Sequence, residues 1–202
     1  MCGVIFQNRF NQSIQLIKKT LDKGRFGKIV NVSLSLLWCR YQKYYSDKWH
    51  GTWKNDGGVM NQQLIHHLDI MRWIFGPIAK VNCITTKRLN KLEAEDTASA
   101  IVKFSNGSLG NIEATTAARP IDLHASMSVV GEKGTAVVSG IAMNEVKVWK
   151  FNNQKNFIEA KIKKNNSQKV PTGYGLSHIF YLNNAFKRIL KKKIEPPVNA
   201  YE

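Results

Sequence analysis

The stretch AIVKFSNGSLGNIEA, residues 100–114, decides the expected fold. Two segments of strand-like composition flank residues 105–108, and the Asn106-Gly107 pair accepts the positive φ angles of a tight hairpin turn. A second turn, GEKG at residues 131–134, joins SMSVV to TAVVSG in the same way. Consecutive strands linked by hairpins leave no room for crossover helices, so the pattern predicts a mainly antiparallel sheet.

Further strands and helices are expected on both sides of these hairpins. Strands are predicted at residues 2–6, 28–40, 78–88, 96–104, 109–117, 121–130, 133–139, 144–151 and, more weakly, 157–163. Helical spacing of apolar residues predicts one helix between an Asn8 cap and Gly24, a second from Gly58 to Gly76, and a third over residues 179–190. Strand 28–40 should run near the sheet centre. The predicted fold class is α+β, a large and mainly antiparallel open sheet with helices packed on one face.

Length and composition favour a single cytoplasmic domain over residues 1–202. A chain of this length with 43% hydrophobic residues can bury a sizeable core without disulfides. Cys2, Cys39 and Cys83 are odd in number and lack metal-ligand spacing, which is typical of reduced thiols and predicts no metal site. Neither a signal peptide nor an apolar run of membrane-spanning length occurs, so no membrane partner is expected.

The formal charge of +16 leaves three interpretations open. The lysines could form a solvated basic surface, attract polyanions without specificity, or bind nucleic acid. Their densest clusters lie at residues 161–164 and 187–193, and no helix-turn-helix, RNP or zinc-finger pattern accompanies them. We therefore expect no specific nucleic-acid partner.

The segment DGGVMNQQLIHHLDIMRWIFG, residues 56–76, carries a polar cluster on an apolar helix. Gln62, His66 and Asp69 are spaced to project to one side of it. His66 could act as a general acid or base near neutral pH, or it could be a core histidine bonded to a backbone carbonyl. Asp69 could orient that imidazole, or it could bond the backbone or a nearby arginine. His67 points away from His66 and is expected to be structural or exposed.

Residues 41–56, YQKYYSDKWHGTWKND, predict an ordered loop because they are aromatic and polar without a regular period. Arg40, Tyr44 and Tyr45 combine donors with flat apolar surfaces, which suits a sugar or a nucleotide, although a loop packed over the sheet explains them equally well. Tyr174 and His178 could line the same cavity. No GxGxxG or P-loop is present to hold a dinucleotide or triphosphate.

Taken together, these segments resemble the C-terminal domain of the Gfo/Idh/MocA oxidoreductases, which has the fold of the glyceraldehyde-3-phosphate dehydrogenase C-terminal domain. The carriers of the resemblance are FGKIVNVSL, WHGTWKNDGGVMNQQLIHHLDIMRWIFGPIAKV, EDTASAIVKFSNGSLGNIEATT, SVVGEKGTAVVSG and HIFYLNNAF. The QNRFN opening and the NQxxxHHxD pattern look most like the UDP-N-acetylglucosaminuronate 3-dehydrogenases of surface-polysaccharide biosynthesis.

The resemblance implies a substrate-binding and oligomerisation domain of an NAD- or NADP-dependent sugar dehydrogenase. It implies a proton-transfer role for His66 and substrate contacts for Asn61 and Gln62, although Gln62 stands where relatives carry aspartate or asparagine. It implies a homodimer or homotetramer formed through the open sheet face. The family's N-terminal Rossmann domain and final C-terminal helix are expected to be missing. Two alternatives stay open: a dehydrogenase of a free sugar or inositol, and a catalytically idle ligand-binding or assembly module.

Overall fold

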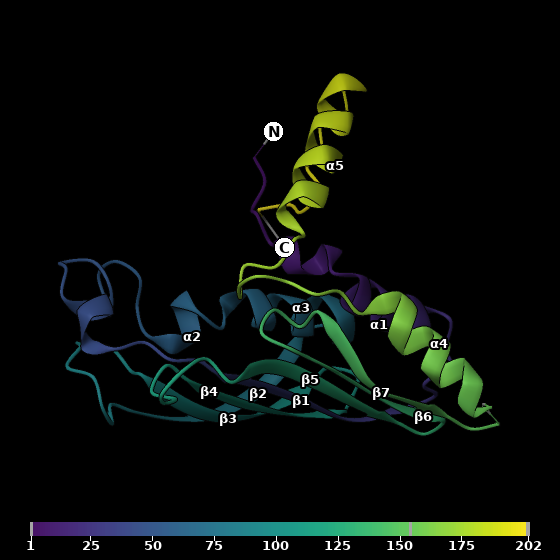
Figure 1. The fold of residues 1–202 in the computed structure, drawn as a ribbon, viewed down its shortest axis with the longest axis horizontal. Helices are drawn as coiled ribbons and strands as arrows, with labels where there is room; N and C mark the ends of the chain where they lie inside the picture. Colours follow the sequence, from purple (N-terminus) through teal and green to yellow (C-terminus); the bar gives the residue numbers. More distant parts are fainter. Residues whose placement is uncertain (1, 154, 201–202) are drawn as a thin grey trace.

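A seven-stranded sheet forms the base of the molecule, in a computed structural model that describes residues 2–153 and 155–200 (Figure 1). The strand order is β2-β3-β4-β1-β5-β6-β7. The strands are β1 (Ile29–Leu37), β2 (Ile78–Thr86), β3 (Thr97–Phe104), β4 (Leu109–Thr115), β5 (His124–Gly131), β6 (Gly134–Ser139) and β7 (Glu145–Phe151). All neighbours are antiparallel except β1 and β4, which run parallel. The prediction of a mainly antiparallel open sheet is confirmed.

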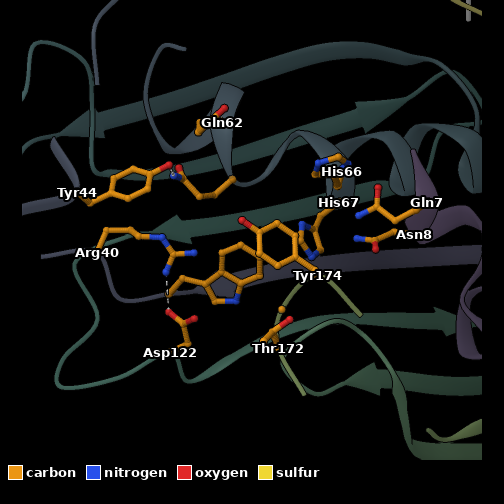
Figure 2. Close-up of a pocket in the computed structure, with 13 residues that line it drawn as sticks. Gln7, Asn8, Arg40, Tyr44, Gln62, His66, His67, Asp122, Thr172 and Tyr174 are labelled. Carbon is orange, nitrogen blue, oxygen red and sulfur yellow. Dashed lines mark hydrogen bonds and ion pairs between the residues drawn. The ribbon is translucent and has the colours of Figure 1, made fainter. Parts of the chain in front are cut away.

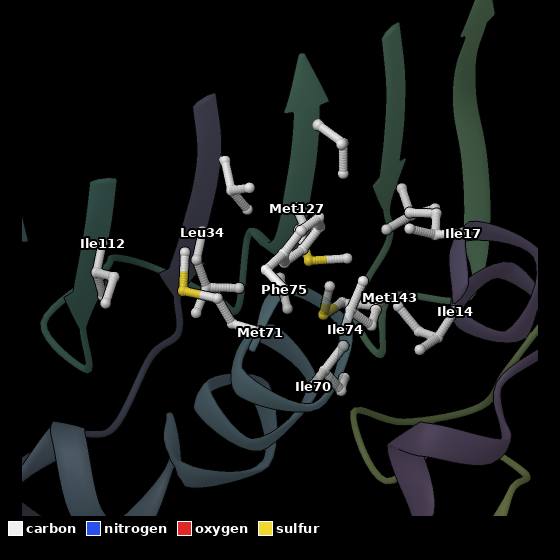
Figure 3. Close-up of a cluster of buried hydrophobic side chains, with 14 of the residues drawn as sticks. Ile14, Ile17, Leu34, Ile70, Met71, Ile74, Phe75, Ile112, Met127 and Met143 are labelled. Atoms are coloured by element: carbon white, nitrogen blue, oxygen red, sulfur yellow. The ribbon is translucent and has the colours of Figure 1, made fainter. Parts of the chain in front are cut away.

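Strand β1 lies at the centre of the sheet, as its alternating sequence predicts. Val32, Leu34 and Leu36 are at most 1% exposed and face the helices, while Ser33 and Ser35 point to the other face. Helices α1 (Gln12–Asp22) and α3 (Ile65–Phe75) cover the apolar face (Figure 1). Burial of each large side chain in this layer contributes about 1.5–3 kcal/mol. The side chains that meet between the helices and the sheet include Ile14, Ile17, Leu34, Ile70, Met71, Ile74, Ile112 and Met127 (Figure 3).

Two predictions near the N-terminus are wrong. Residues 2–6 form only an isolated bridge between Gly3 and Asn199 and join neither edge strand of the sheet, β2 or β7. Asn8 does not cap α1, since it lies inside a 3₁₀ turn, η1 (Gln7–Phe10). The N-cap of α1 is Asn11, whose backbone oxygen accepts from the Gln15 N–H at 2.9 Å.

The weak strand predicted at 157–163 is also wrong, because residues Asn156–Asn166 form helix α4. Ile158 and Ile162 are four apart and both half-buried, a helical spacing that the period-two interpretation overlooked. Glu159 accepts ion pairs from Lys150 of β7 at 2.5 Å and from Lys163 at 2.7 Å. These contacts fix α4 against the edge of the sheet.

Helix α5 (His178–Leu190) projects away from the sheet (Figure 1). It meets the rest of the chain near η1, where the Tyr181 ring packs edge-on against Phe10 at 5.8 Å. Apolar residues along its length remain 44–82% exposed: Ile179, Phe180, Leu182, Phe186, Ile189 and Leu190. Within the described ranges, no helix has the length and apolar character that a bilayer crossing requires.

Candidate functional site

A cavity of about 340 Å³ lies above the sheet, where the N-terminal end of α3 meets η1, the residues after β1 and the segment 172–174 (Figure 2). Its lining combines amides, imidazoles, aromatic rings and one ion pair. The lining residues are Gln7, Asn8, Trp38, Arg40, Tyr44, Gln62, Gln63, His66, His67, Asp122, Thr172, Gly173 and Tyr174. Such mixed apolar and polar walls are typical of small-molecule sites.

The helix predicted over residues 58–76 is broken in two, which sets the geometry of this cavity. A short helix α2 (Val59–Gln62) ends before α3 begins at Ile65. Gly58 precedes α2 where a Cβ would overlap the carboxyl group and the backbone oxygen of Glu95. The break places Gln62 at the end of one helix and His66 in the first turn of the next, and both line the cavity.

His66 is a largely buried imidazole at the cavity wall. Its Nδ1 atom is buried and has no hydrogen-bond partner in the described part of the chain, and the Phe6 ring packs edge-on at 5.6 Å. Burial lowers the pKa of His66 below its usual value; Asp69 opposes this shift and His178 adds to it. The ring is therefore neutral near pH 7 and able to accept a proton.

Asp69 binds an arginine, one of the alternatives that the sequence left open. Arg9 donates from Nε to Asp69 Oδ2 at 2.8 Å and from Nη2 to Oδ1 at 2.6 Å. Both side chains are nearly buried, at 7% and 8% exposure. The His66 Nδ1 atom has no hydrogen-bond partner among the described residues, so Asp69 does not hold that side of the ring. The ion pair instead ties η1 to α3.

His67 is a buried structural residue. It is 1% exposed, and the Trp38 ring lies edge-on to it at 5.8 Å. Burial, reinforced by neighbouring His66, lowers the pKa of His67 to about 3. A contact with the Gln63 backbone opposes this shift, but its geometry falls short of a hydrogen bond, and neither His67 ring nitrogen has a partner among the described residues. His67 thus stays neutral at physiological pH.

The other end of the cavity carries an ion pair. Arg40 Nη1 donates to Asp122 Oδ1 at 3.0 Å, and its guanidinium lies 5.3 Å from the Trp38 ring centre and 5.6 Å from that of Tyr44. Gln63 Nε2 donates to the Tyr44 hydroxyl at 3.4 Å. The Asp122 carboxylate offsets the charge of Arg40, so this end presents directional donors more than a net positive field.

The structure brings together some of the predicted site residues and separates others. Arg40, Tyr44, Gln62, His66 and Tyr174 all line the cavity. The other three lie outside its lining: Asn61, Tyr45 and His178.

Asn61 is exposed beyond the end of the cavity. The Tyr45 hydroxyl forms a 2.7 Å hydrogen bond with Thr116 Oγ1, and burial raises the pKa of Tyr45 to about 12. His178 affects His66 only through charge. The binding roles predicted for these three residues remain predictions.

Eight lining residues were not predicted as part of the site: Gln7, Asn8, Trp38, Gln63, His67, Asp122, Thr172 and Gly173. Gln7 and Asn8 belong to the QNRFN opening, so a signal was present, but it pointed to family membership without assigning a role. Asp122 lies 82 residues from Arg40 along the chain, and no local pattern could have paired them.

The fold is thus an open, mainly antiparallel sheet with a cavity on its helical face that His66 and His67 line. A family model described as the GFO/IDH/MocA C-terminal domain matches residues 14–137, which is more than half of the chain. The chain belongs to this family. A comparison with curated protein sequences finds no match.

Among solved structures, two similar ones are WlbA dehydrogenases in complex with NADH and UDP-GlcNAcA. The enzyme from Bordetella pertussis is 34% identical, with a TM-score of 0.86 over 99% of this chain and 56% of its own. The enzyme from Chromobacterium violaceum is 31% identical, with a TM-score of 0.84 over 97% of this chain and 54% of its own. A levoglucosan dehydrogenase shares the fold at 20% identity and a TM-score of 0.78, over 96% of this chain and 57% of its own. The chain thus spans little more than half the length of these relatives.

Proposed function

We propose that this chain is the substrate-binding domain of an NAD(P)-dependent dehydrogenase that oxidises a secondary hydroxyl of a sugar. The neutral, largely buried His66 at the wall of a polar cavity is the observation that carries the proposal. Similarity to two dehydrogenases that bind UDP-GlcNAcA supports a UDP-sugar uronic acid as the substrate class.

In this proposal His66 takes the proton of the reacting hydroxyl. Its lowered pKa keeps the ring unprotonated at neutral pH, so it is ready to act as a base. The hydroxyl oxygen loses its proton to His66, and the carbon that bears this hydroxyl loses a hydride to the nicotinamide, which leaves a ketone. Gln62, at the end of α2, would hold the sugar within hydrogen-bonding reach of the imidazole.

The nicotinamide that takes the hydride must come from another domain. The described residues contain no unit in which a strand, a glycine-rich turn and a helix follow one another to hold a dinucleotide diphosphate. Helix α5 is the proposed docking face for such a domain, since its first turn lies beside η1, one wall of the cavity, and its apolar residues stay exposed. The part of each WlbA enzyme that this chain does not cover would correspond to that domain.

We expect a homodimer or homotetramer through the open sheet face. Ile84, Ile101 and Leu109 are 50–76% exposed on the open face of β2, β3 and β4, and an apolar surface of this kind favours association. Light scattering of the purified protein would test this expectation. The thiols of Cys2, Cys39 and Cys83 are all free, which supports a reducing, cytoplasmic location.

Two rival functions have support of their own. A dehydrogenase of a free sugar or inositol fits the same cavity, because the Arg40 charge is already offset by Asp122. A catalytically idle binding module is supported by the lack of a dinucleotide site on the described chain.

The test is to supply a family dinucleotide-binding domain, fused or in trans, and to follow NADH absorbance with UDP-GlcNAcA, UDP-N-acetylglucosamine, glucose and inositol. NADH formation with UDP-GlcNAcA alone supports the proposal, and formation only with free sugars or inositol supports the first rival. A well-folded complex that forms no NADH with any of them leaves the idle module.

A further inference from the structure

Two side-chain amides, Gln7 and Asn8, lie in the cavity wall, and the oxygen of each lacks a hydrogen-bond partner among the described residues. They are 4% and 3% exposed, and Gln7 Oε1 and Asn8 Oδ1 are buried without partners in the described part of the chain. Figure 2 shows the two amides side by side, next to the rings of His66 and His67. Buried amides are nearly always hydrogen-bonded in folded proteins, so two neighbouring amide oxygens without partners in one cavity need an explanation.

The amide pair is held rigidly, so its lack of partners does not come from a loose segment. Arg9, the next residue, forms the buried two-point ion pair with Asp69 on α3. Gln15 Nε2 donates to the Arg9 backbone oxygen at 2.6 Å. Asn11 binds on both sides, donating to the Ala142 carbonyl at 2.8 Å and accepting from Ser177 Oγ. The 3₁₀ turn therefore presents Gln7 and Asn8 at a fixed place relative to His66.

The cavity lining next to the amide pair carries no charged side chain, since Arg9 and Asp69 do not line the cavity. Burial lowers the pKa of both His66 and His67, so both rings are neutral near pH 7. The charged side chains of the cavity, Arg40 and Asp122, pair with each other where the chain leaves β1. An amide offers both a donor and an acceptor, which matches a hydroxyl or an acetamido group and gives no preference to a carboxylate or a phosphate.

We propose that Gln7 and Asn8 form a specificity-determining subsite for the uncharged hydroxyl and acetamido groups of the sugar ring that His66 faces. This inference rests on the proposed function and extends it. It places the sugar ring against Gln7 and Asn8 and the diphosphate of the substrate elsewhere in the cavity. The carboxylate of a uronic acid would face away from the pair, because no positively charged group lines this part of the cavity.

The proposal has an unusual consequence for stability. Replacing an unpaired buried amide by an apolar side chain of similar shape removes a desolvation cost and loses no internal hydrogen bond. Gln7→Met and Asn8→Leu should therefore melt no lower than the wild type, while each weakens sugar binding about 10-fold. A residue that served only the fold would show the opposite combination.

The experiment is calorimetric titration of the chain with UDP, UDP-N-acetylglucosamine and UDP-GlcNAcA, together with thermal melting of each variant. Gln12→Met is the matched control, because Gln12 is exposed on the same segment and does not line the cavity. We expect Gln7→Met and Asn8→Leu to weaken both sugar nucleotides by a similar factor and to leave UDP unchanged. The control should bind all three ligands as the wild type does.

Three results would overturn the subsite. The first is wild-type affinity in both variants, which would leave the proposed function standing. The second is an equal loss for UDP and for the sugar nucleotides, which would mean that the pair contacts the nucleotide. The third is a fall in melting temperature that accompanies the loss of binding. If the wild type binds the sugar nucleotides no better than UDP, the proposed function fails and the subsite fails with it.

Discussion

Breaking the ion pair between Arg9 and Asp69 should destabilise the fold more than any exposed charge change. The change is Arg9→Met, which keeps the aliphatic length and removes the guanidinium. Asp69 would then be a carboxylate with 8% exposure that has lost two hydrogen bonds of 2.8 and 2.6 Å. Removing one partner of a buried pair costs about 3–5 kcal/mol because the remaining charge is uncompensated. Arg9 also lies 5.3 Å from the Trp73 ring centre, which adds a smaller loss.

The assay is urea unfolding followed by circular dichroism, on a double-mutant cycle. The double variant Arg9→Met/Asp69→Leu should recover most of the free energy of unfolding that Arg9→Met loses, since it leaves no buried charge behind. Lys18→Met is the matched control: its pair with Asp22 is solvent-exposed, and such helical pairs contribute about 0.3–0.5 kcal/mol. A loss below about 1 kcal/mol for Arg9→Met, or a double variant as unstable as the single one, would refute this account of how η1 is fixed.

Three further changes probe the surroundings of the site. The pKa of His67 is about 3 in the folded protein and 6.5 in the unfolded chain, so acid protonates the unfolded state first. The free energy of unfolding, measured by urea titration, should therefore fall by about 2 kcal/mol between pH 6.5 and about pH 5. The His67→Phe variant should show a smaller fall. Tyr45→Phe should lose about 1 kcal/mol with its Thr116 hydrogen bond yet bind UDP-sugars normally by calorimetry, whereas weaker binding would return Tyr45 to the site. Gly58→Ala should lose about 1–3 kcal/mol by thermal melting because its Cβ overlaps Glu95, and an unchanged melting temperature would contradict that packing.

Much of the sheet could be predicted because its signals are local. The Asn106-Gly107 turn and the alternation along residues 28–40 specify a hairpin and a central strand from a few neighbouring residues. Two of the errors have different causes. Residues 156–166 carry a local helical spacing at Ile158 and Ile162 that the period-two interpretation overlooked. Residues 2–6 bridge to the C-terminal segment at Asn199, a distant contact that no local pattern contains.

The candidate site was only half accessible from the sequence. His66, Gln62 and Arg40 stand in recognisable patterns, and all three line the cavity. The partner of Asp69 is 60 residues away, and the unpaired state of Gln7 and Asn8 is a property of three-dimensional packing. No spacing rule contains that information, because each depends on how η1 is fixed against α3.

The most direct test of the account is the pH dependence of turnover when this chain is joined to a family dinucleotide-binding domain, for the wild type and His66→Asn. If His66 is the base, the variant should lose about 100-fold or more in kcat with little change in KM, because general-base catalysis typically contributes that much. The acidic limb of the wild-type kcat profile should fall below pH 6.5, following the lowered pKa of His66, and should be absent in the variant. Equal kcat values and identical pH profiles would contradict the central claim.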